Sequence, residues 1–212
     1  RAGFGKVVFV VSKAIEKDFR DIYSKRLDGK IDFDFAVQDV SKLPEGITTN
    51  PERVKPWGTG HAIWCAKDKI SAPFASVNAD DFYGQKAYEL MGNFLAHEAR
   101  PDLHSMVGYY LKDSLSEFGT VSRGICSIDE NQLLTTVTEH TKIEAKEDKI
   151  VSYFENEAIE IDPLSLTSMN FWGFHPGLFE HLDALLDEFL EKNGMDLKSE
   201  FYIPSVVHHL LE

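Results

Sequence analysis

The segment ASVNADDFYG, residues 75–84, places two neighbouring carboxylates at the end of a short apolar run. Asp80 and Asp81 then precede an aromatic pair and a glycine. Carboxylates at the end of a buried strand suit Mg²⁺, which binds one or two of them together with phosphate oxygens and water. Asp and Gly are also common turn residues, so a polar turn without any ligand is the alternative interpretation.

The composition is that of a folded protein rather than of a disordered chain. The 212 residues are 43% hydrophobic and include 15 Phe, 7 Tyr and 3 Trp, which is enough apolar material for a large core. The net charge of −13 argues against a nucleic-acid polymer as a partner, since proteins that bind one present a basic face. Small phosphorylated ligands stay possible, because a bound divalent cation reverses the local field.

Cysteine usage and hydropathy bear on the cellular compartment. Cys65 and Cys126 are far apart and lack metal-ligand spacing, which favours a reduced, cytoplasmic protein. No apolar run reaches the length of a membrane span, so we expect no membrane partner.

The first half of the chain alternates predicted strands with predicted helices. Residues 6–11 are a continuous apolar run, which is typical of a strand buried on both faces. Periodicity predicts further strands at residues 31–37, 74–79 and 105–111, and helices at residues 13–25, 59–70 and 85–96. This alternation predicts an α/β fold with a Rossmann-like, mostly parallel sheet. Ligands gather at the carboxyl ends of such strands, where Asp80 and Asp81 are expected.

The second half changes character. Turn-linked apolar segments predict antiparallel hairpins at residues 120–144 and 149–161, and residues 168–174 are expected to return to the main sheet. An apolar stripe at helical spacing over residues 178–190 predicts a core-facing helix. No repeat or linker divides the chain, so we expect residues 1–212 to form a single domain.

Five motifs, taken together and in this order, resemble those of a known enzyme family. They are PWGTGHAIWCAKDKI (residues 56–70), PFASVNADDFYG (73–84), SEFGTVSRG (116–124), VTEHTK (137–142) and SMNFWGF (168–174). The chain is similar in these segments to the sugar-1-phosphate nucleotidyltransferases, the group of the glucose-1-phosphate thymidylyl- and uridylyltransferases.

The resemblance implies a nucleotide-diphospho-sugar transferase fold and a specific reaction. A phosphate oxygen of a sugar 1-phosphate attacks the α-phosphate of a nucleoside triphosphate, and pyrophosphate is released with the help of Mg²⁺. The nucleophile is already an anion, so no general base is needed. The protein must instead hold two polyanions together and stabilise the charged transition state.

The metal and nucleotide residues follow by position in the motifs. Asp80 corresponds to the catalytic, metal-binding Asp of the family, and Asp81 is expected to support it. Gly58, Thr59 and Gly60 correspond to the segment that lies against the nucleotide, where bare backbone permits close approach. A glycine at the start of a helix is the alternative role for Gly58.

The sugar residues follow in the same way. Gly119 and Glu139 correspond to residues that contact the sugar, and a solvated strand acid is the less favoured interpretation of Glu139. Lys142 is expected to bind the sugar phosphate in catalysis, but two residues separate it from Glu139 where the family has none. Asn170 lies on a strand that lines the family's pocket.

Three residues near these motifs have no assigned role. His61 either faces the nucleotide or is packed in the fold. Arg123 is either a cation close to the sugar loop or a solvated side chain, and Trp172 is adjacent to the pocket strand.

Two motifs of the family are missing. The Gly-rich loop that wraps the triphosphate has no equivalent here, and neither has the second metal-binding Asp. The resemblance therefore implies a fragment truncated at both ends, in which an exposed sheet edge could pair with a second copy of the chain. Two other functions stay open: a glycosyltransferase that uses nucleotide sugars, and a non-catalytic protein that binds nucleotide or sugar phosphate.

Overall fold

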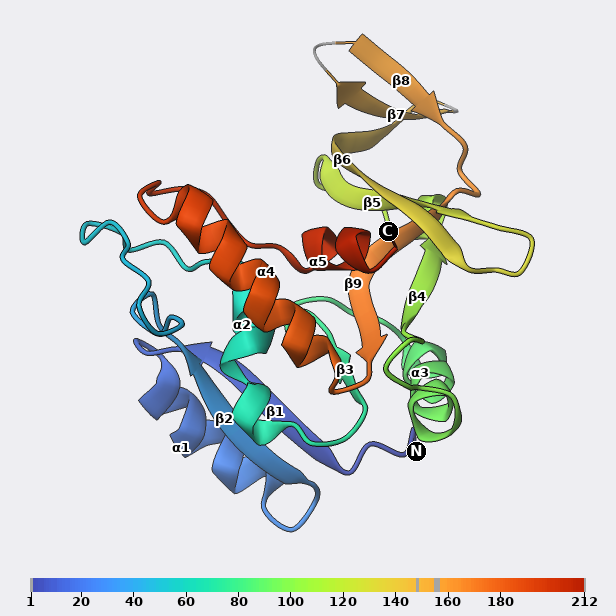
Figure 1. Ribbon diagram of the computed structural model, residues 1–212. Coiled ribbons are helices and arrows are strands. Elements are labelled where there is room, and N and C mark those ends of the chain that lie inside the picture. The colour runs from blue at the N-terminus through green and yellow to red at the C-terminus, as the bar shows by residue number, and fades with distance from the viewer. Residues whose placement is uncertain (1, 148, 155–156, 212) are drawn as a thin grey trace.

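The computed structural model describes residues 2–147, 149–154 and 157–211, and its strands form two separate sheets (Figure 1). In the smaller sheet, β1 (Lys6–Ser12) and β2 (Asp32–Gln38) pair in parallel. Helix α1 (Glu16–Leu27) contacts this sheet through rings of Phe19 and Phe9, whose centroids are 5.4 Å apart.

The larger sheet has seven strands, and every pairing within its described residues is antiparallel. The strands are β3 (Phe74–Ser76), β4 (Ser105–Tyr110), β5 (Val121–Ile128), β6 (Leu134–Lys146), β7 (Lys149–Phe154), β8 (Glu157–Ile161) and β9 (Leu166–Phe174). Their order is β3-β9-β5-β6-β7-β8, and β4 also pairs with β9.

The expectation of a Rossmann-like, mostly parallel sheet is wrong. Across the described ranges, β1 with β2 is the one parallel pairing, whereas the large sheet is antiparallel. The reason is the position of β9, which is hydrogen-bonded to both β3 and β4 and runs opposite to each. Strands β3 and β4 therefore run in the same direction, as strand–helix alternation predicts, but their hydrogen bonds go to β9. Alternation does not reveal which strand comes between two others.

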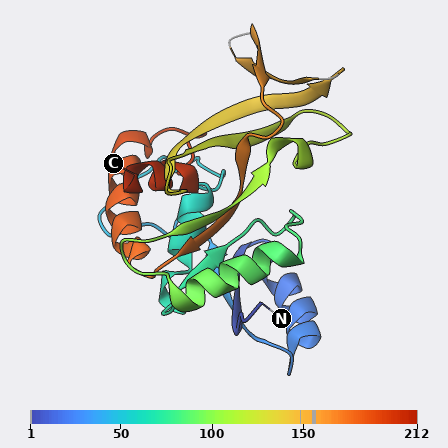
Figure 2. The same ribbon diagram turned by 90° about the vertical axis from the view of Figure 1, so that its right-hand side faces the viewer.

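The side chains of strand β9 enter two hydrophobic cores, one on each face of the strand. Figure 2 shows the path of this strand through the sheet. Phe171 packs with residues of helix α3 (Gln85–His97) on one face. Trp172 and Phe174 face the opposite way and pack with helix α4 (Leu178–Asn193). Because alternate side chains of a strand point to opposite faces, this one strand joins both layers of helices to the sheet.

The boundaries of several elements differ from those predicted. Strand β3 ends at Ser76, so Asp80 and Asp81 lie in the loop that follows it rather than directly at its end. Helix α2 (Thr59–Cys65) is shorter than expected, and a 3₁₀ turn (Lys67–Lys69) follows it. Helix α5 (Ile203–Leu210) is an addition to the predicted elements. Within the described ranges, no helix combines the length and the apolar character needed to cross a membrane.

The buried side chain of Arg53 joins two loops that are distant in sequence. Its guanidinium group lies over the ring of Trp57, 3.5 Å from the centroid. Its nitrogens donate to four backbone carbonyl oxygens at 2.6 to 3.1 Å, those of Lys55, Pro56, Asp196 and Ser199. These bonds fix the segment before α2 against the segment before α5, so Arg53 has a structural role.

We predict that Arg53→Gln lowers the free energy of unfolding by about 2–4 kcal/mol, because it removes a buried network of charged hydrogen bonds. Urea denaturation measures this change. Arg100→Gln is the matched control, since the exposed side chain of Arg100 forms an ion pair with Asp102, and such pairs contribute less than about 1 kcal/mol. Equal denaturation midpoints for the two variants would contradict this role for Arg53.

Candidate functional site

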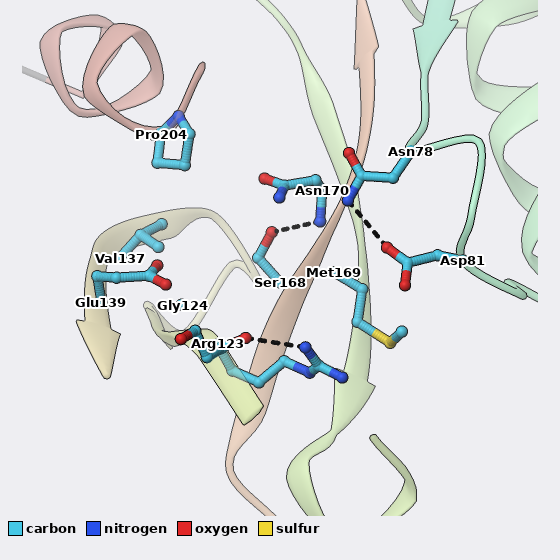
Figure 3. A pocket seen from close by; sticks show the side chains of 11 residues that line it. Asn78, Asp81, Arg123, Gly124, Val137, Glu139, Ser168, Met169, Asn170 and Pro204 are labelled. Atoms are coloured by element: carbon cyan, nitrogen blue, oxygen red, sulfur yellow. Dashed lines mark hydrogen bonds between the residues drawn. The ribbon is translucent and has the colours of Figure 1, made fainter. Parts of the chain in front are cut away.

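A small polar pocket lies where the loop after β3 meets β5, β6, β9 and the start of α5 (Figure 3). Its volume is about 50 Å³, enough for a few water molecules or for the polar part of a ligand. The polar residues that line it come from well-separated parts of the sequence: Asn78, Asp81, Ser122, Arg123, Glu139, Ser168 and Asn170.

The loop after β3 is held against β9 by a buried tyrosine. The hydroxyl of Tyr83 accepts a hydrogen bond from the backbone N–H of Asn78 at 3.0 Å and donates to the carbonyl oxygen of Met169 at 2.9 Å. Burial raises the pKa of Tyr83, so it stays protonated as a donor. Asn78 Nδ2 in turn donates to Asp81 Oδ2 at 2.8 Å. The other oxygen of Asp81, Oδ1, has no hydrogen-bond partner in the described structure.

Glu139 on β6 lies beside Gly124 of β5, its partner in the sheet. A Cβ atom at Gly124 would lie only 2.6 Å from Val137 Cγ1, so the glycine leaves room for Val137, whereas its 3.6 Å distance to Glu139 Oε2 would be an ordinary contact. The side chain of Glu139 is largely exposed to solvent, although desolvation by the neighbouring atoms raises the pKa of its carboxyl group, against the attraction of Arg123. Its carboxylate oxygens accept no hydrogen bond from the described residues, so they are available to a ligand.

Arg123 on β5 brings a positive charge to the pocket. Its Nη1 donates to the carbonyl oxygen of Ser122 at 2.8 Å, and its Nη2 donates to that of Ser114 at 2.6 Å. Nε is buried and has no acceptor in the described part of the chain. Burial lowers the pKa of Arg123, against the attraction of Asp81 and Glu139. The guanidinium group is thus held by two carbonyls and incompletely bonded.

Asn170 on β9 has a positive φ of 61°, and its backbone N–H donates to Ser168 Oγ at 3.1 Å. Its side-chain oxygen accepts a hydrogen bond from Trp172 Nε1 at 3.3 Å. Because the oxygen is engaged, the amide nitrogen Nδ2 is the atom that Asn170 can offer to a ligand. Trp172, which is buried, therefore orients Asn170.

The pocket unites some of the residues predicted from the sequence and not others. Asp81, Glu139 and Asn170 line it together. Asp80, Gly119 and Lys142 are exposed and do not line it, and the backbone of Lys142 has a positive φ of 58°.

The predicted nucleotide segment packs against the chain itself. A Cβ atom at Gly58 would lie 2.6 Å from the carbonyl oxygen of Phe201, and one at Gly60 would lie 2.7 Å from the Phe201 ring. Thr59 Oγ1 accepts a hydrogen bond from the backbone N–H of Ile203 at 3.0 Å. The two glycines are thus needed for close contact between α2 and the segment before α5. Nucleotide binding by Gly58, Thr59 and Gly60 stays a prediction.

His61 is a packed histidine, fully buried on α2. Its Nε2 lies 2.7 Å from the carbonyl oxygen of Lys42, and its Nδ1 lies 3.3 Å from Gln38 Nε2. The ring also stacks on Trp64, with centroids 5.6 Å apart. These partners fit a neutral ring that donates from Nε2 and accepts at Nδ1.

Sequence reasoning gave no role to Arg123 and missed Asn78 and Ser168, which line the same pocket. The signal for Asn78 was its place in the loop with Asp81, where a short amide side chain commonly bonds a nearby group. The signal for Arg123 was a lone cation within a segment of uncharged residues, VSRGICS. Nothing in the sequence indicates that Ser168 meets Gly124 across the sheet, although the two are paired.

The donor set near the loop is compatible with Mg²⁺. Among the residues that the structure describes, no three or more His, Cys, Asp and Glu side chains form a group that could hold a metal ion. Mg²⁺ commonly binds one or two carboxylates and takes its other ligands from phosphate and water. The exposed Asp80 and the free Oδ1 of Asp81 suit that mode of binding.

Comparison with known proteins finds no family model and no curated protein that matches this chain. The resemblance to the nucleotidyltransferases therefore rests on the sequence motifs alone, and the function must be argued from the pocket.

We predict that the pH dependence of stability includes a contribution from His61. Burial lowers its pKa below the ordinary 6.5, so the unfolded chain binds a proton more readily than the folded protein. The contribution of His61 to the free energy of unfolding is then fully present above pH 6.5 and is lost as the pH drops below it. Urea denaturation at several pH values measures this slope.

His61→Gln should make the slope below pH 6.5 shallower than in the wild type, whatever its effect on stability at pH 8. His97→Gln, at the exposed end of α3, is the control and should keep the wild-type slope. An unchanged slope in His61→Gln would show that His61 binds its proton equally well in the folded and the unfolded chain, which would contradict the prediction.

Proposed function

We propose that the chain carries the acceptor pocket of a Mg²⁺-dependent nucleotidyltransferase, which transfers a nucleotidyl group from a nucleoside triphosphate to a sugar 1-phosphate and releases pyrophosphate. The observation that supports this most is the convergence of Asp81, Glu139 and Asn170 with Arg123 in one polar pocket. Glu139 and Asn170 were assigned to the sugar from separate motifs, and Asp81 was expected to support the metal-binding residue Asp80. The three come from β6, β9 and the loop after β3.

The free atoms of the pocket suit a sugar. The carboxylate of Glu139 accepts hydrogen bonds and the amide nitrogen of Asn170 donates them, so together they complement sugar hydroxyls, which do both. A few convergent polar groups of this kind fix the orientation of a ligand.

The chemistry needs positioning rather than proton transfer. The phosphate oxygen of the acceptor is already an anion, so Glu139 and Asn170 would act by orienting the sugar and not as acid or base. Asp80 and Asp81 would hold Mg²⁺, and the bound ion would neutralise part of the phosphate charge. Both cysteines are free, which agrees with the proposed cytoplasmic setting.

A non-catalytic protein that binds a sugar phosphate is the second candidate. The observation that favours it is the packing of Gly58 and Gly60 against Phe201, in the segment to which the resemblance assigns the nucleotide. The two candidates share the acceptor pocket and differ in whether a triphosphate is used.

We predict that Glu139→Gln weakens binding of glucose 1-phosphate in the presence of Mg²⁺ by about 10- to 100-fold, the loss expected for charged hydrogen bonds. Isothermal titration calorimetry measures the affinity. Glu130→Gln, in the exposed turn of the same β5–β6 hairpin, is the matched control and should bind as the wild type does. Equal affinities of Glu139→Gln and wild type would remove Glu139 from the site.

A pyrophosphate-release assay with sugar 1-phosphates, nucleoside triphosphates and Mg²⁺ separates the candidate functions. The enzyme proposal expects release that requires both substrates. Binding of sugar phosphate without release would favour the non-catalytic protein. Formation of nucleoside diphosphate from a nucleotide sugar would instead indicate a glycosyltransferase, and absence of both binding and release would contradict the proposal.

A further inference from the structure

The positively charged side chain in the pocket is that of Arg123, a residue to which the resemblance assigns no role. Lys142, expected to meet the sugar phosphate, is exposed and does not line the pocket. Arg123 lines it, together with Asp81 and Glu139. We propose that Arg123 binds the phosphate group of the acceptor, a role that rests on the proposed function of the pocket.

The bonding of Arg123 differs from that of a structural arginine in the same chain. Arg53 donates to four backbone carbonyls and stacks on Trp57, so its hydrogen-bonding capacity is largely used. Arg123 donates to two carbonyls, those of Ser114 and Ser122, although a guanidinium group carries five N–H donors. Its buried Nε lacks any acceptor among the described residues.

Such incomplete bonding needs an explanation, because buried donors in native proteins are nearly always paired. A ligand oxygen that arrives in the pocket, with a small rotation of the side chain, would supply the missing acceptor.

The charge of Arg123 is also unpaired at short range. Among the described residues, none of its nitrogens forms an ion pair with a carboxylate within the 4.0 Å that defines one. Asp81 and Glu139 attract it only from farther away. Two backbone carbonyls meanwhile restrict the guanidinium group, whose planar fork matches the oxygens of a phosphate. A restrained, partly desolvated and unpaired arginine is well suited to an anionic ligand group.

The positions of the two acids indicate how such a ligand would lie. Glu139 and Asp81 stand on opposite sides of the pocket, and the guanidinium group of Arg123 extends beneath Met169 towards the Asp81 side (Figure 3). Sugar hydroxyls would then face Glu139, while the phosphate would lie between Arg123 and Asp81. The pocket has two carboxylates for one cation, so tight binding of a phosphate should also require Mg²⁺.

The test compares two ligands that differ only in the phosphate, glucose 1-phosphate and glucose, by calorimetry with Mg²⁺ present. The ratio of their affinities measures the contribution of the phosphate. Arg123→Gln should reduce this ratio at least about 10-fold and leave glucose binding unchanged, since one charged hydrogen-bonding partner is lost. Arg123→Lys keeps the charge without the fork and should restore part of the ratio.

Two further variants and two further ligands complete the design. Arg100→Gln controls for the loss of any surface arginine and should keep the wild-type ratio. Lys142→Gln tests the competing residue and should also keep it. Inorganic phosphate should compete with glucose 1-phosphate in the wild type and lose affinity in Arg123→Gln. In Arg123→Gln, the affinity for a nucleoside triphosphate should fall less than the affinity for glucose 1-phosphate.

Each outcome has a distinct meaning. If the ratio of the two affinities is unchanged in Arg123→Gln, or falls in Lys142→Gln instead, the role of Arg123 is overturned while the proposed function stands. A loss confined to the triphosphate overturns it as well, because the cation would then serve the nucleotide. If the wild type binds neither glucose nor glucose 1-phosphate, the proposed function itself fails. Unfolding curves and Arg123→Lys exclude misfolding as the cause of a loss.

Discussion

The placement of β9 is the constraint on which the rest of the structure depends. Its backbone is hydrogen-bonded to β4 on one side and to β3 and β5 along the other, so three strands lose their partner if it is displaced. Its alternate side chains enter two different cores. At Gly173 a Cβ atom would lie 2.2 Å from the sulfur of Met91, so helix α3 packs directly on the strand backbone. Few substitutions in β9 would leave both cores intact.

The pocket is a consequence of that placement. Ser168 and Asn170 are part of β9, and Gly124 of β5 is paired with Ser168 next to Arg123. The loop that carries Asp81 is fixed to the same strand by the hydrogen bond from Tyr83 to Met169. The walls of the pocket are therefore tied to the sheet through hydrogen bonds and strand pairing. Polar groups held in this way lose little freedom on binding a ligand, which favours affinity and a single orientation.

Much of the local structure could be predicted from the sequence. Alternation at residues 31–37 predicted β2 to within one residue, and the apolar stripe at residues 178–190 predicted the buried face of α4. These patterns report whether a residue faces a core, which depends on nearby positions. The predicted strand at residues 74–79 was too long, because β3 ends at Ser76 and the side chain of Asn78, in the loop that follows, bonds Asp81.

The sheet and part of the site could not be predicted, because both depend on contacts between distant residues. The pairing of β3 and β4 with β9 joins segments that are far apart in sequence, and no local pattern encodes it. For the same reason Arg123 could not be separated from a solvated side chain, because the pocket that it lines is completed by Asp81 and Asn170, which are distant from it in sequence. The motifs pointed to Glu139 and Asn170, both of which line the pocket. They did not show which of the adjacent acids, Asp80 or Asp81, lines it, whereas the structure shows that Asp81 does.

The central claim is that the pocket beside β9 is where a sugar 1-phosphate binds. Titration of glucose 1-phosphate and Mg²⁺ into ¹⁵N-labelled protein, followed by amide chemical shifts, tests it most directly. The account predicts that the largest changes occur at the amides of Gly124, Met169 and Asn170, which surround the pocket. Changes confined to Thr59 and Gly60, or no changes at saturating ligand, would contradict it.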